Sequence, residues 1–137
     1  MTCSRTALII FFCLFSFLSS AQTTQLIGAS EEYILENVTG YASVEERGIE
    51  HEEFNVLVFE DKGRELSFYF TFYRGGKICS YIKNTAPLPA LKDEINFIKA
   101  NFVNTRDNIW ENADKTVQVH INTSEGQGAI VVKELRK

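Results

Sequence analysis

Apolar and hydroxyl-bearing residues alternate without a break along residues 66–73. The even-numbered positions are apolar (Leu66, Phe68, Phe70, Phe72) and the odd-numbered ones carry hydroxyls (Ser67, Tyr69, Thr71, Tyr73). Successive side chains of a β-strand point to opposite faces of its sheet. The segment therefore predicts a strand with one face in the core and an opposite face that is wet or only partly covered.

Other segments rich in β-branched and aromatic residues predict the rest of the sheet. We expect further strands over Phe54–Phe59, Lys77–Ile82, Asn108–Asn112, Thr116–Ile121 and Gly128–Leu135, with a short one near Tyr41–Glu46. The polar segments 60–65, 74–76 and 122–127 all contain glycine, which favours tight turns between antiparallel strands.

Two segments carry helix signals. Ser30 is a suitable N-cap, acidic residues follow it, and Gly40 stands where a helix-terminating glycine belongs, so we expect a helix over Ser30–Val38. The second helix should open at residues 87–89 (Pro-Leu-Pro), because proline is favoured in a first turn. Its apolar residues then recur every three or four positions, as in an amphipathic helix: Leu88, Leu91, Ile95, Ile98 and Phe102.

The order helix, strands, helix, strands predicts an α+β fold. We expect a small single domain with an antiparallel sheet of five to seven strands and two helices packed on one face, formed by residues 22–137.

Residues 1–21 are typical of a cleavable signal peptide. Arg5 supplies a positive charge, residues 7–18 are apolar apart from Ser16, and the small residues Ser-Ser-Ala precede Gln22. The apolar run is shorter than the roughly 20 residues of a membrane-spanning helix. We therefore expect cleavage after Ala21, export to the periplasm or the extracellular space, and no membrane span afterwards.

Charge and cysteine content narrow the function classes. The net charge of the full chain is −4, and loss of Arg5 with the leader makes it one unit more negative. An acidic domain has no electrostatic reason to bind nucleic acid. Cys3 and Cys13 leave with the leader, so Cys79 alone remains and cannot form an intramolecular disulfide.

A run of acidic residues surrounds His51: Glu45, Glu46, Glu50, Glu52 and Glu53. Carboxylates and imidazole are ligands for divalent metals. The spacing matches no calcium or zinc motif, so we interpret the run as a solvated loop or edge strand. The sequence indicates no metal site and no cofactor.

Cys79 with His120 or His51 is the candidate nucleophile–base pair. If Ile78 and Ile82 face the core, simple alternation places Cys79 and Tyr81 on the opposite side. His120 alternates with core-type valines and would lie on that same side. The alternative interpretation is a small half-buried cysteine and an exposed histidine.

Tyr69, Tyr73 and Tyr81 are the candidate ligand-binding residues. Tyrosine has a rigid apolar body with a polar tip, and it is enriched at binding surfaces. The same residues would instead be structural if a helix covered them or if they only formed cross-strand pairs.

The chain contains no glycine-rich phosphate loop, no G-x-S-x-G and no H-E-x-x-H motif, and we assign no catalytic residues. We expect a non-enzymatic exported module that binds a protein or a small ligand through an exposed sheet face. Two alternatives remain open. One is a small hydrolase or thiol enzyme that uses Cys79 or carboxylates, and the other is an envelope component that assembles with itself.

Overall fold

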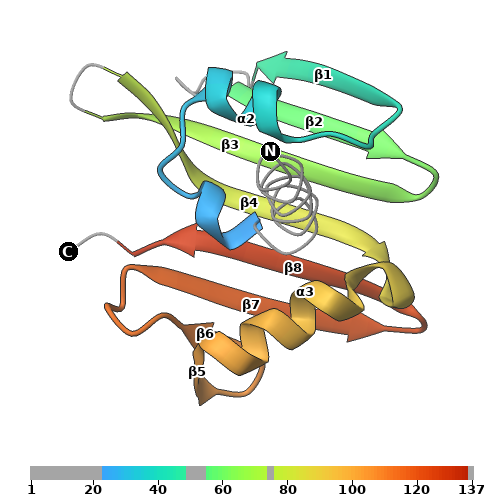
Figure 1. Ribbon diagram of the computed structural model, residues 1–137, viewed down its shortest axis with the longest axis vertical. Coiled ribbons are helices and arrows are strands. Elements are labelled where there is room, and N and C mark those ends of the chain that lie inside the picture. The colour runs from blue at the N-terminus through green and yellow to red at the C-terminus, as the bar shows by residue number, and fades with distance from the viewer. Residues whose placement is uncertain (1–22, 49–54, 74–75, 136–137) are drawn as a thin grey trace, which may run out of the picture.

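The computed structural model describes residues 23–48, 55–73 and 76–135, and the predicted leader lies outside these ranges (Figure 1). Within them, eight strands form one sheet in the order β1-β2-β3-β4-β8-β7-β6-β5. All neighbouring strands are antiparallel. The strands are β1 (Ser43–Gly48), β2 (Asn55–Asp61), β3 (Arg64–Tyr73), β4 (Gly76–Pro87), β5 (Val103–Arg106), β6 (Ile109–Glu111), β7 (Val117–Ser124) and β8 (Gln127–Glu134).

An α+β fold with an antiparallel sheet is thus observed, but the fold prediction is wrong in its strand number, because eight exceeds five to seven. The unexpected strand is β5, whose residues are all exposed, so no apolar alternation marks it in the sequence. The predicted order is also partly wrong, because the 3-10 helix η1 (Thr23–Leu26) precedes the first α-helix.

Two hairpins close through tight turns with glycine in second position. Lys62-Gly63 joins β2 to β3, and Glu125-Gly126 joins β7 to β8. All four residues have positive φ, between 43° and 81°. Two successive residues with positive φ form the turn that matches the twist of paired strands. These turns fix the registers that decide which side chains share a face of the sheet.

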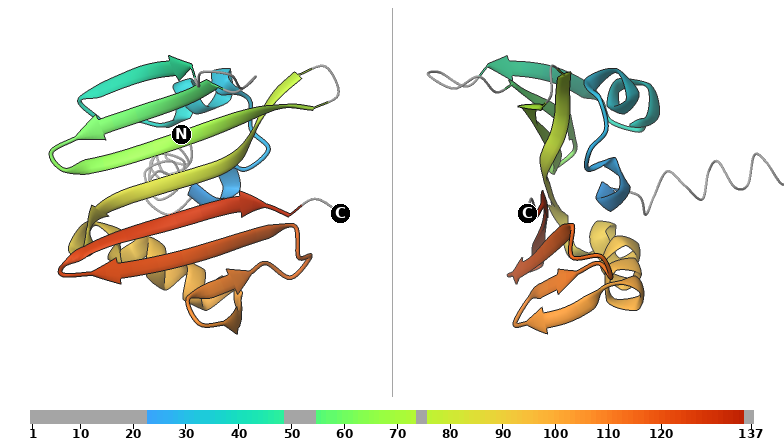
Figure 2. Two further views of the ribbon diagram at one scale, coloured as in Figure 1. Left: turned by 180° about the vertical axis from the view of Figure 1, so that it is seen from behind. Right: turned by 90° about the vertical axis from the view of Figure 1, so that its left-hand side faces the viewer.

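Both α-helices lie on one side of the sheet, as Figure 2 shows in the edge-on view. Helix α2 (Glu31–Asn37) begins where Ser30 accepts a hydrogen bond from the Tyr33 amide at 3.2 Å, which confirms the predicted N-cap. Helix α3 (Leu88–Asn101) opens on the predicted prolines. It approaches β8 closely, because a Cβ on Gly128 would lie 2.8 Å from the Leu91 side chain.

The core fills the space between the sheet and these helices. Ile34 of α2 and Leu91 and Ile98 of α3 are buried against it. The sheet contributes alternate residues from its five longest central strands: Leu57, Phe59, Leu66, Phe68, Phe70, Cys79, Ile82, Ala86, Val119, Ile121, Ile130 and Val132. On the face of β3 predicted to be apolar, Leu66, Phe68 and Phe70 are therefore in the core, whereas Phe72, near the end of the strand, is exposed.

Among the described residues, one carboxyl side chain is buried on this side. Glu94 of α3 is 5% exposed and accepts a hydrogen bond from the Asn84 amide at 2.9 Å. Its other oxygen, Oε1, accepts no hydrogen bond within the described residues. Burial raises the pKa of the Glu94 carboxyl, and hydrogen bonds from Thr23 and Asn84 act in the opposite direction.

None of the helices in the described part of the chain is long and apolar enough to cross a membrane.

Candidate functional site: the open face of the sheet

We call the face of the sheet turned away from the helices the open face (Figure 2). Cross-strand pairing defines which residues share it. Tyr69 of β3 pairs with Tyr81 of β4, Tyr81 pairs with Lys133 of β8, and Lys133 pairs with Gln118 of β7. These four side chains form a row across the middle of the sheet, because directly paired residues of adjacent strands point to the same face.

Tyr69 and Tyr81 form a cross-strand pair on this face, so the pairing named as their structural alternative is present, whereas a covering helix is not. Their ring centroids are 5.1 Å apart and the rings are nearly perpendicular, at 89°. Both side chains are half-buried, and both helices lie on the opposite side. Burial raises the pKa of the Tyr81 phenol, and Tyr69 adds to the shift, so Tyr81 stays a neutral hydrogen-bond donor at physiological pH. The side chain of the third predicted residue, Tyr73, lies outside the described residues.

An open depression of about 280 Å³ adjoins Tyr81. Its lining comes from β4, β7 and β8: Tyr81, Gln118, His120, Asn122, Val131 and Lys133. Residues on β8 alternate, with Ile130 and Val132 in the core and Val131 and Lys133 on the open face. The depression therefore brings one of the predicted tyrosines together with a lysine, a histidine and two amide side chains.

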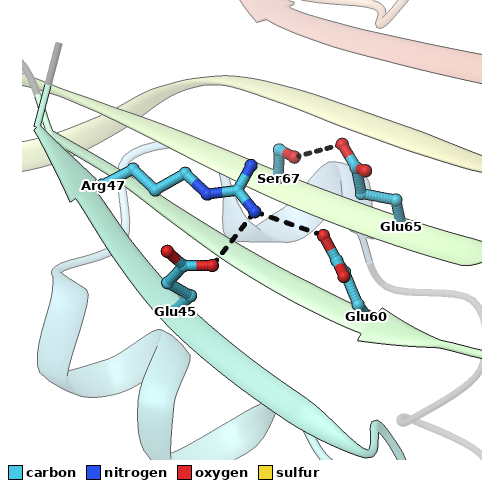
Figure 3. Close-up of polar contacts among 5 residues, drawn as sticks. All are labelled: Glu45, Arg47, Glu60, Glu65 and Ser67. Atoms are coloured by element: carbon cyan, nitrogen blue, oxygen red, sulfur yellow. Dashed lines mark hydrogen bonds and ion pairs between the residues drawn. The ribbon is translucent and has the colours of Figure 1, made fainter.

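A group of carboxylates occupies the far end of the open face, over β1, β2 and β3 (Figure 3). We call Glu45, Glu60 and Glu65 the acidic corner. Arg47 contacts Glu45 at 3.0 Å and Glu60 at 3.4 Å, and Ser67 contacts Glu65 at 3.4 Å. Among the described residues, Arg47 is the cation that forms ion pairs with this group, so three carboxylates share one paired cation.

The prediction that Cys79 shares a side with Tyr81 is wrong. The pairing of β3 with β4 shifts between Tyr69 and Phe70, where Tyr69 faces Tyr81 but Phe70 faces Cys79. Ser80 is the extra residue, and such a β-bulge reverses the alternation of side chains. Cys79 is consequently buried in the core, whereas His120 lines the depression on the open face. Burial raises the pKa of the Cys79 thiol to about 12.

Only part of the acidic run around His51 falls in the described ranges, because residues 49–54 lie outside them. Glu45 belongs to the acidic corner. Glu46 instead accepts a hydrogen bond from Asn55 at 3.1 Å, and it points to the helix side because neighbouring residues of a strand alternate. Among the described residues, no group of three or more histidine, cysteine, aspartate or glutamate side chains could hold a metal ion.

Sequence reasoning missed Lys133, Gln118 and Asn122 as members of the site. Alternation already placed Gln118 and His120 on one face of their strand. The missing information was that β8, the last strand, inserts next to β4 and brings Lys133 beside Tyr81. That neighbourhood is a property of strand order, which local patterns do not encode.

Comparisons with protein-family models, with curated proteins and with solved structures found no match to this chain, so its candidate site rests on its own geometry.

Proposed function

We propose that this chain is an exported, non-enzymatic binding domain that holds another molecule against the open face of its sheet. The observation that carries the proposal is the Tyr69–Tyr81 pair beside a depression lined by polar and cationic side chains. Both α-helices pack on the opposite face, so they do not cover the tyrosines (Figure 2). Half-buried tyrosines bring a large contact area to an interface at a low cost in side-chain entropy.

The geometry disfavours the thiol-enzyme alternative. Cys79 is 0% exposed, and its raised thiol pKa keeps it protonated near neutral pH. His120 lies across the sheet from it, on the other face. A nucleophile and its base must lie within hydrogen-bond reach of each other.

A carboxylate-based hydrolase also gains little support. Glu60 and Glu65 are directly paired across β2 and β3, but Arg47 and Ser67 already contact them. The depression lies instead over β4, β7 and β8. The acid pair and the concave part of this face are therefore separate.

Export is the second part of the proposal. Export is inferred from the positive charge of Arg5, the apolar run over residues 7–18 and the small residues before Gln22. The mass of the protein recovered from outside the cytoplasm tests it, since cleavage after Ala21 predicts a chain that begins at Gln22. Recovery of the uncleaved chain from the cytoplasm would contradict it.

Site-specific photo-cross-linking tests the binding role in the cells that produce the protein. A photoreactive residue in place of Tyr69 should give a discrete adduct, whereas the same residue in place of Asp93, on α3, should give none. The captured molecule is then identified by mass spectrometry and its affinity is measured with purified components. Equal cross-linking from both positions would refute binding through the open face, and an adduct of two copies would favour self-assembly.

The affinity measurement uses a matched pair of variants. Tyr69→Ala with Tyr81→Ala should weaken binding roughly ten-fold or more, because buried tyrosines are frequent interface hot spots. Tyr33→Ala removes an exposed tyrosine from α2, on the helix side, and should leave the affinity unchanged. An unchanged affinity in the double variant would exclude the tyrosine pair from the interface.

A further inference from the structure

The shape of the depression follows from the sizes of side chains on three adjacent strands. On β8, the open-face residues next to Lys133 are the small Val131 and Ala129. The flanking strands carry longer side chains, with Tyr81 on β4 and His120 on β7. Small residues on a central strand between larger ones on its neighbours produce a hollow, and Val131 forms its apolar floor.

Each polar side chain around this floor can donate a hydrogen bond, and Lys133 can only donate. Lys133 brings an ammonium group and has no ion-pair partner in the part of the chain that the structure describes. The Tyr81 hydroxyl and the Asn122 amide can also donate, and His120 offers a ring N–H. Donors that converge on an apolar floor fit a ligand with an anionic head and an apolar stem.

The net charge of the site limits how many negative charges the ligand can carry. Glu111 lies on the same row and accepts a hydrogen bond from Gln118 at 3.3 Å. Its negative charge partly offsets the positive charge of Lys133. Lys83, paired with Val131, adds one more cation at the margin. A small positive excess matches a monoanion better than a doubly charged phosphate, because the acidic residue would repel the second charge.

We propose that the depression is a binding site for a monocarboxylate on a flat or apolar stem, with the carboxylate beside Lys133 and the stem between Tyr81 and Val131. This inference rests on the proposed function, because it specifies the chemistry that the open face recognises. Such a group is found in small organic acids and at acidic side chains or chain ends of peptides. All of these share the carboxylate chemistry.

The test uses benzoate as the probe and benzamide as its uncharged counterpart of the same shape. Titrated into ¹⁵N-labelled protein, benzoate should shift the amide signals of the lining residues of β7 and β8 in a saturable way. Benzamide should bind at least five-fold more weakly, and added salt should weaken benzoate binding, because the ion pair is exposed to solvent.

Two lysine variants make the test specific. Lys133→Gln should lower benzoate affinity by about two- to five-fold, the size expected for the loss of one exposed ion pair. Lys92→Gln removes an exposed lysine from α3, on the other side of the molecule, and should change nothing. Equal binding of benzoate and benzamide, or an unchanged affinity in Lys133→Gln, would overturn the carboxylate assignment.

The two proposals fail in distinguishable ways. If cross-linking at position 69 captures a partner but benzoate leaves the lining signals unmoved, the carboxylate site is wrong and the binding domain stands. If benzoate binds and peptides ending in a free carboxylate bind more tightly than their C-terminal amides, the partner is a peptide rather than a small acid. If neither a partner nor benzoate engages the open face, both proposals fall.

Discussion

Glu94→Gln replaces a buried ionisable carboxyl with a neutral amide of nearly the same shape. Glu94 is 5% exposed, and burial raises the pKa of its carboxyl in the folded protein. In the unfolded chain the pKa returns to about 4.3–4.5. Between these two pKa values the folded state binds a proton that the unfolded state has released. The free energy of unfolding of the wild-type protein therefore falls as the pH rises through this window.

The size of the effect follows from proton linkage. While only the folded state carries the proton, stability falls by about 1.4 kcal/mol for each pH unit. The stability that the raised pKa of Glu94 contributes is fully present below about pH 4.5. It is lost as the pH rises through the pKa of the folded state. The glutamine side chain of the variant does not titrate, and its carbonyl can still accept the Asn84 hydrogen bond, which is 2.9 Å long in the wild type.

Urea denaturation of both proteins between pH 4 and pH 8 gives the difference in unfolding free energy at each pH. We expect the free energy of unfolding of Glu94→Gln to rise relative to that of the wild type as the pH rises above about 4.5. At low pH the variant can be the less stable protein, because its amide places two donors beside the unpartnered Oε1 position. Asp93→Asn, on the exposed side of α3, controls for the loss of one carboxylate. Parallel pH profiles for Glu94→Gln and the wild type would refute the reasoning.

Three further predictions concern the core and the first helix. Phe68 is fully buried, so Phe68→Ala should lower the free energy of unfolding by about 3–5 kcal/mol in urea titrations, and a loss below about 1 kcal/mol would contradict its place in the core. Cys79 should react with a thiol reagent such as dithionitrobenzoate only after denaturation, because its side chain is 0% exposed, and fast labelling of the native protein would show that the buried position is wrong. Ser30→Ala should cost about 1 kcal/mol by removing the cap of α2, whereas Ser30→Asp should retain most of the stability, as thermal melts can check.

The sequence contained enough information for most of the individual elements. The alternation over residues 66–73 correctly indicated a core face bearing Phe68 and Phe70, and the apolar spacing of α3 identified Leu91 and Ile98 as buried. Such signals are local, because they depend only on the period of a strand or a helix.

What the sequence did not reveal depends on contacts between distant segments. The bulge at Ser80 moves Cys79 from the open face into the core, and no residue type around Cys79 marks it. The strand β5 carries no apolar alternation, since packing does not require any of its side chains to be buried. The depression exists only because β8 inserts beside β4. Alternation could therefore place Tyr81, Gln118 and His120 on faces of their strands, but it could not show that they surround one depression.

The strand order also bears on how quickly the chain can fold. Strands β1 to β4 and strands β5 to β8 each form a meander whose neighbours are consecutive in sequence. The pairing of β4 with β8 joins segments as far apart as Tyr81 and Lys133. Closing that long loop costs more chain entropy than forming any hairpin. We therefore expect the two meanders to form early and their seam to close late, with φ-values near zero at Val132 and higher values within the β2–β3 hairpin. The candidate depression spans this seam, so it is complete only after the last step of folding.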